Sequence, residues 1–92
     1  MFHMELSERY IQQLEKDGYN PVYEHYDEPN TTYKTHAHKE EHAMIIVEGS
    51  MKVMIDADMT TYFVNDRFVI PSNVEHSVVI GPKGCKYVIG EK

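Results

Sequence analysis

From Gly18 onward the sequence consists of short segments, with apolar residues at alternate positions or in brief runs, separated by turn-forming clusters. Such segments at a spacing of about 8–12 residues are typical of β-sandwiches and β-barrels. The predicted strands are Pro21–Tyr26, Thr32–His38, His42–Glu48, Met51–Ile55, Thr61–Val64, Arg67–Ile70, His76–Ile80 and Lys86–Ile89. The breaks predicted between them include Gly49-Ser50 and the turn from Gly81 to Gly84. The pattern therefore predicts an all-β fold.

One short N-terminal helix is expected before these strands. Ser7 is a good N-cap, and Asp17-Gly18 supplies a stop signal. Tyr10, Ile11 and Leu14 form one apolar stripe between them. A chain of 92 residues makes one domain. Within it, residues 1–20 are expected to carry a helix packed on a barrel formed by residues 21–92.

Charge and cysteine content exclude several classes of partner. The net charge is -6, from 15 acidic and 9 basic side chains, which argues against nucleic acid and anionic membranes. Cys85 is the only cysteine, so no intrachain disulfide can form and a reducing, cytoplasmic location is expected. A small core and exposed strand edges favour a homodimer.

Histidines are concentrated at one place in the sequence. His36, His38 and His42 share one parity, so their side chains are expected on the same face of an extended chain. His76 opens a later strand after a turn that contains proline. Clustered imidazoles suit transition metals, although a His-x-His pair alone is also common on exposed strand edges.

The spacing of these residues resembles that of the cupins. The first cupin motif, G-x5-H-x-H-x3,4-E-x6-G, corresponds to Asn30, His36, His38, His42 and Gly49. The second, G-x5-P-x-G-x2-H-x3-N, corresponds to Asn65, Pro71, Asn73, His76 and Ile80. The resemblance implies a jelly roll, also called a double-stranded β-helix. Asparagine stands at three glycine positions and tolerates positive φ best among the other residues, so the turns are expected to persist.

The resemblance also implies a metal site, with one departure from the family. Cupins hold the ion with three histidines and a glutamate, whereas His42 replaces that glutamate here. The expected ligands of one divalent ion (Zn, Ni, Fe or Mn) are therefore His36, His38, His42 and His76. A neutral set of imidazoles leaves the charge of the ion uncompensated, which favours anionic ligands.

The cupin fold hosts many chemistries, so two functions stay open. The first is a metal-dependent enzyme, of dioxygenase or isomerase type, acting on a small anionic or enolisable substrate. The alternative is a non-catalytic binding or sensing module in which the metal anchors a small molecule. No acid or base is evident inside the predicted barrel.

Other residues could line the cavity. Lys34 shares the parity of His36 and could reach the cavity, or could lie exposed at a strand end. Met44, Met54 and several tyrosines could line a pocket or fill the core.

Overall fold

Residues 4–92 form one helix followed by six β-strands. The structure, a computed structural model, describes residues 4–92. The elements are α1 (Leu6–Lys16), β1 (Val22–Asp27), β2 (Thr32–His36), β3 (His42–Ile55), β4 (Asp58–Phe63), β5 (Arg67–Ile70) and β6 (His76–Glu91). The prediction of an all-β fold with one N-terminal helix is confirmed. Within residues 4–92, no helix is long and apolar enough to cross a membrane.

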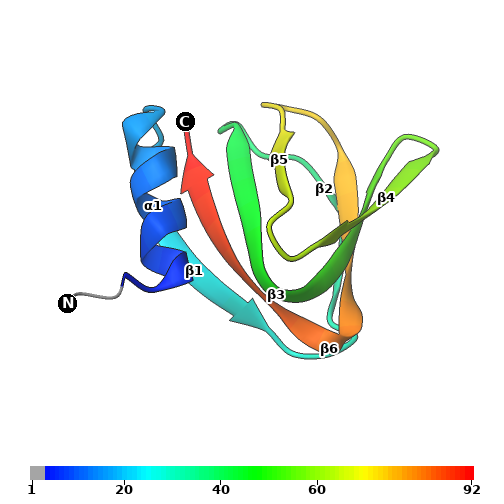
Figure 1. The fold of residues 1–92 in the computed structure, drawn as a ribbon. Helices are drawn as coiled ribbons and strands as arrows, with labels where there is room; N and C mark the ends of the chain where they lie inside the picture. The colour runs from blue at the N-terminus through cyan, green and yellow to red at the C-terminus, as the bar shows by residue number, and fades with distance from the viewer. Residues whose placement is uncertain (1–3) are drawn as a thin grey trace.

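All the strand pairs are antiparallel, and two long strands organise them. The strand order is β1-β6-β3-β4, with β2 added on β6 and β5 added on β3. The first part of β3 pairs with the last part of β6, around Met44 and Ile89, and its second part pairs with the start of β6, around Val53 and Val78. Both strands curve along their length, so that β2, β4 and β5 fold over towards one another (Figure 1). The space they enclose is the interior of the barrel.

Two breaks predicted from the sequence are wrong. Gly49-Ser50 lies inside β3, and the segment from Gly81 to Gly84 lies inside β6. The glycines mark irregular positions within continuous strands, since the β3–β6 register shifts between Gly49 and Met51. Gly49 has a φ of 79°, and a Cβ atom there would lie 2.0 Å from the carbonyl oxygen of Gly84. Glycine is therefore needed for the two backbones to approach so closely.

The turns at the three asparagines are as predicted. Asn30, Asn65 and Asn73 have φ values of 64°, 75° and 61°. Each thus adopts the left-handed conformation that glycine would adopt at that position. The backbone of Asn73 also donates a hydrogen bond to the carbonyl oxygen of His38, at 2.7 Å. This contact ties the second turn to the loop that carries the first histidines.

Helix α1 begins earlier than predicted. Glu5 is its N-cap and makes no side-chain capping bond, while Ser7, the predicted cap, lies within the first turn. Leu6, the first residue of the helix, packs against the core formed by α1, β3 and β6. The helix ends at Lys16, before the predicted stop at Asp17-Gly18. Of the stretch 1–20 assigned to the helical part, residues 1–3 lie outside the described residues.

The apolar run at the start of β3 is buried on both faces. Met44 and Ile46 face the barrel interior, where they join a core that includes Ile80 and Tyr87. The alternate residues Ala43, Ile45 and Val47 join a second core with Tyr10 and Leu14 of α1. A strand with two covered faces is expected to be continuously apolar rather than alternating. The helix therefore completes the fold by covering the outer face of β3 and β6.

Candidate metal centre and ligand cavity

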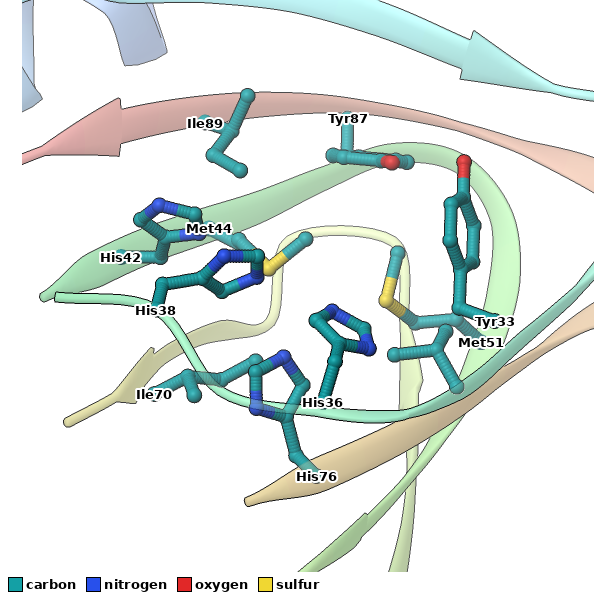
Figure 2. A pocket seen from close by; sticks show the side chains of 11 residues that line it. Tyr33, His36, His38, His42, Met44, Met51, Ile70, His76, Tyr87 and Ile89 are labelled. Carbon is teal, nitrogen blue, oxygen red and sulfur yellow. The ribbon is translucent and has the colours of Figure 1, made fainter. Parts of the chain in front are cut away.

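Three histidines meet at one end of the barrel interior. His36 ends β2 and is paired in register with His76, the first residue of β6. His38 lies in the loop after β2, whose position is fixed by the hydrogen bond from Asn73. Figure 2 shows the three rings turned towards one another from these separate segments. Pairing of β2 with β6 thus brings together the two sequence motifs.

The distances within this group are short enough for a shared ligand. The ring centroid of His36 lies 4.6 Å from that of His38 and 4.4 Å from that of His76. The remaining pair, His38 and His76, is 5.2 Å apart. One nitrogen of each of the three rings lies within 4.8 Å of the corresponding nitrogens of the others. One ion bound between them would be within reach of all three after small adjustments.

Backbone carbonyl groups orient two of the rings. Nδ1 of His36 faces the carbonyl oxygen of Lys34, and Nδ1 of His76 lies 2.9 Å from the carbonyl oxygen of Val74. A carbonyl only accepts, so each Nδ1 carries the hydrogen, and the Nε2 lone pair is left available as a metal ligand. This arrangement is common behind metal-binding histidines, where it fixes the tautomer and the ring orientation. The Nε2 atoms that these rings present are therefore suitable ligands for a divalent transition metal.

His42 lies beside this group and not within it. Its ring stacks on that of His38, with centroids 4.5 Å apart and an angle of 25° between the planes. Its ligand nitrogen belongs to a second group with Glu40 and Glu91, whose ligand atoms also lie within 4.8 Å of one another. Of the four predicted ligands, the structure brings three into one set and places the fourth between that set and two carboxylates.

Two of the imidazoles, those of His38 and His42, are held towards the uncharged form. Burial, followed by the charges of His42, His36 and His76, lowers the pKa of His38 below its usual value of 6.5. Burial also lowers the pKa of His42, while Glu91 and Glu40 act in the opposite direction. Neutral imidazole is the form that binds metals. These two imidazoles are thus in the form that binds a metal ion at neutral pH.

A small, mostly apolar cavity opens beside the histidines. Its volume is about 230 Å³. The residues that line it are Tyr33, His36, His38, His42, Met44, Met51, Ile70, His76, Val78, Tyr87 and Ile89. Pockets for drug-sized molecules measure about 300–1,000 Å³, so this cavity suits something smaller. Met44 lines it as considered from the sequence, whereas Met54 is 40% exposed.

Two tyrosines, Tyr33 and Tyr87, lie in the cavity wall. The sequence suggested that several tyrosines could line a pocket but did not single these out. The β2–β6 register shifts between Tyr33 and His36, so simple alternation fails across this stretch. Tyr33 consequently lines the cavity. Of the two alternatives for Lys34, reaching the cavity or lying exposed at a strand end, the structure shows the exposed one. Tyr87 comes from the far end of the sequence, and only its place in an apolar strand hinted that it points inward.

Both tyrosines contact a buried carboxylate. The hydroxyl groups of Tyr33 and Tyr87 donate to Asp27, at 2.5 and 2.7 Å. Asp27 is the last residue of β1 and is only 6% exposed. Burial and the bond to Asp27 raise the pKa of Tyr33 to about 12, and the same causes raise the pKa of Tyr87. Both hydroxyls therefore keep their hydrogens at neutral pH.

Comparison with known proteins assigns the fold to a family. Residues 23–89 match the family described as "Cupin domain". No curated protein matches the chain closely enough to establish a relationship.

Three solved structures illustrate the similarity. An RmlC-like cupin from Shewanella frigidimarina is 23% identical, with a TM-score of 0.68, over 76% of this chain and 62% of its own. KdgF from Halomonas sp. is 17% identical, with a TM-score of 0.65, over 76% and 67%. The DMSP lyase DddQ from Ruegeria pomeroyi is 17% identical, with a TM-score of 0.70, over 77% and 36%. The chain thus spans less than two thirds of the first of these structures and about a third of the last. At these identities the similarity concerns the fold.

The family match covers most of the chain, and the architecture of two long curved strands with histidines between them agrees with it. This chain therefore belongs to the cupin family.

Proposed function

We propose that this cupin binds one divalent transition metal through His36, His38 and His76, with His42 as the fourth ligand. The metal anchors a small anionic molecule in the adjoining cavity. The observation that carries the proposal is the convergence of three imidazoles, two of them oriented by backbone carbonyl groups, at the edge of a small apolar cavity. Zn, Ni, Fe and Mn all fit such a donor set, and availability decides among them.

The chemistry of the cavity determines what the metal would hold. When bound, the ion supplies positive charge and open coordination positions. Apolar side chains such as Met44 and Ile89 line the wall next to the histidines. A ligand with a carboxylate or enolate at one end and a short apolar body satisfies both surroundings. Small carboxylic acids and enolisable diketones belong to this class.

A second candidate function is catalysis on such a molecule. The observation that favours it is the pair of tyrosines in the cavity wall, Tyr33 and Tyr87, because a tyrosine hydroxyl can act as a general acid or base. A general base works best when its pKa is near the working pH. The pKa of Tyr33 is raised to about 12, so this tyrosine is a poor base at neutral pH. Binding is therefore better supported than catalysis.

Metal analysis is the direct test of the proposal. Protein purified without added metal should contain close to one transition-metal ion per chain by elemental analysis. Replacing His38 or His76 with alanine should abolish this metal. The matched control is His25→Ala, which removes a histidine that lies outside the cavity lining and is half exposed. Metal retained in both cavity variants, or lost equally in the control, would contradict the assignment.

Ligand binding is tested with and without the metal. Titration calorimetry with butanoate and acetylacetone should detect millimolar or tighter binding to the loaded protein and much weaker binding after chelation. Oxygen uptake and isomerisation of the bound diketone are assayed in parallel, since turnover would support the second candidate. Equal binding to loaded and metal-free protein would show that the metal is not the anchor.

A further inference from the structure

A second polar group lies in the cavity, apart from the histidines. Tyr33 comes from β2 and Tyr87 from β6, and Figure 2 shows their hydroxyl groups close together on the far side of His36 from His42. Asp27 lies behind them, at the end of β1. The cavity therefore has two polar ends with apolar side chains between them, and the function proposed above uses only the histidine end.

The hydrogens of both hydroxyl groups are committed to Asp27. Tyr33 donates to Oδ1 and Tyr87 donates to Oδ2 of the same carboxylate. Nε2 of His25 lies 3.1 Å from Oδ1 and can serve as a third donor. A carboxylate only accepts, and hydrogen bonds to it are stronger than bonds to neutral acceptors. Both tyrosine hydroxyls thus stay directed at buried Asp27. If either hydroxyl donated elsewhere, part of the carboxylate's charge would be left without a hydrogen bond.

Both hydroxyl oxygens consequently remain available as hydrogen-bond acceptors. A phenolic oxygen that donates its only hydrogen still has lone pairs that can accept one. A ligand atom beside these oxygens is favoured when it carries a hydrogen, as in a hydroxyl or ammonium group. A methyl group in the same place would displace any water there without replacing its hydrogen bonds.

We infer that Tyr33 and Tyr87 form a second binding subsite, which accepts hydrogen bonds from a hydroxyl or ammonium group on the end of the ligand away from the metal. This inference rests on the proposed function, because it takes the anionic end of the ligand to be held at the histidines. The ligand class is thereby narrowed to short carboxylic acids with a hydroxyl or amino group at the opposite end.

Charge and size both favour this class. The carboxylate of Asp27 repels a second carboxylate from the tyrosine end, whereas a metal ion held by the histidines would attract one. The ligand is therefore oriented in one direction. Met44 and Met51 lie along the wall between the two ends, where they can contact a short methylene chain. A volume of about 230 Å³ limits that chain to a few carbons.

The test compares acids that differ only at the far end. Calorimetry on metal-loaded protein measures butanoate against 4-hydroxybutanoate, and pentanoate against 5-hydroxypentanoate and 5-aminopentanoate. In these compounds the added group is far from the carboxylate, so it gains little from chelating the ion. The acid with a hydroxyl or amino group should bind about tenfold more tightly, which is the usual worth of one well-formed hydrogen bond.

Variants assign the preference to the tyrosines. Tyr33→Phe and Tyr87→Phe should each reduce the preference to about threefold or less. Tyr26→Phe is the matched control, since Tyr26 is 49% exposed and lies outside the lining, and it should keep the full preference. The ratio of two affinities in one variant does not depend on the fraction of folded protein, so partial unfolding does not obscure the result.

The outcomes separate the subsite from the metal anchor. Metal-dependent binding without any preference in the unaltered protein overturns the subsite alone. A preference that persists in both phenylalanine variants overturns its assignment to these residues. Binding that ignores the metal overturns the proposed function, and with it the orientation on which the subsite depends.

Discussion

Asn30 holds a backbone conformation that few side chains tolerate. Its φ of 64° costs most L-residues about 1–2 kcal/mol, and asparagine less. Asn30→Ala is therefore expected to lower the free energy of unfolding by about 1 kcal/mol, while Asn30→Gly changes it little. Urea denaturation of the two variants measures the difference. If alanine proves as stable as glycine, then this turn does not require a left-handed residue.

His42 is the predicted metal ligand at which this chain departs from the cupin motif. It lies against His38 on one side and near Glu40 and Glu91 on the other. His42→Ala is expected to weaken metal binding by about tenfold or more, as loss of a ligand or of its support does. His42→Glu restores the donor that cupins use and should retain the metal. Competition with a chromogenic chelator measures both affinities.

The alternative for His42 is a place outside the metal site altogether. In that case the alanine variant would keep full occupancy under the same competition. Glu40→Gln serves as a control, because it removes a neighbouring charge and leaves the imidazole in place. If Glu40→Gln lowers the metal affinity as much as His42→Ala does, then the effect comes from the charge near His42 and not from ligation of the metal by His42.

Sequence spacing predicted part of this site. The meeting of the histidines could be predicted because they share one parity and match the spacing of the cupin motifs, whereas their binding of an ion stays a prediction. The asparagine turns were predictable for a similar reason, since few residues suit positive φ. Tyr33 could not be singled out among the tyrosines because the register shift before His36 breaks the alternation on which parity depends. The contact between Asp27 and Tyr87 joins residues far apart in the chain, and no local pattern encodes it.

At the scale of elements, the long strands β3 and β6 were each predicted as two. Their glycines resemble turn signals, and the sequence alone does not distinguish a turn from a bend inside a strand. The difference lies in pairing, because Gly49 and Gly84 approach each other across β3 and β6. A hairpin at either place would have separated the two halves that enclose the cavity.

The close approach of these strands makes Gly49 sensitive to substitution. Gly49→Ala combines strain at a φ of 79° with a Cβ atom only 2.0 Å from the Gly84 carbonyl oxygen. We expect a loss of about 2–5 kcal/mol in the free energy of unfolding, from strain and overpacking together. The measurement is denaturation by urea or guanidinium chloride.

Gly18 provides the matched control for this substitution. Its φ is also positive, at 94°, but an added Cβ would meet no atom closer than 3.6 Å. Gly18→Ala should therefore lower the free energy of unfolding by only about 1–2 kcal/mol, from backbone strain alone. Equal losses in the two variants would show that contact between β3 and β6 at Gly49 is not tight.

For the whole molecule, metal binding and folding are expected to be coupled. The candidate ligands come from β2, the following loop, β3 and β6, so an ion would link segments that meet only in the folded state. An ion that binds only the folded protein stabilises it by about 2.7 kcal/mol at a concentration 100 times its dissociation constant. In a domain of 92 residues this is a large share of the total stability.

The same histidines should make the stability of the metal-free protein depend on pH. The pKa values of His38 and His42 are lowered by burial, so the unfolded chain binds protons more readily at these positions than the folded chain. Their contribution to stability is therefore fully present above a pH of about 6.5 and is lost as the pH falls through the lowered folded values. Thermal unfolding of chelated protein at pH 7.5 and pH 5.5 measures this loss.

Added metal should raise the unfolding temperature more at pH 7.5 than at pH 5.5, because protons compete with the ion for the same nitrogens. His38→Gln should abolish the increase caused by metal and reduce the loss of stability on acidification, since glutamine does not titrate. His25→Gln, outside the cavity, should preserve the metal-dependent increase. An increase of equal size at both pH values, or one that survives in His38→Gln, would mean that the ion binds elsewhere on the protein.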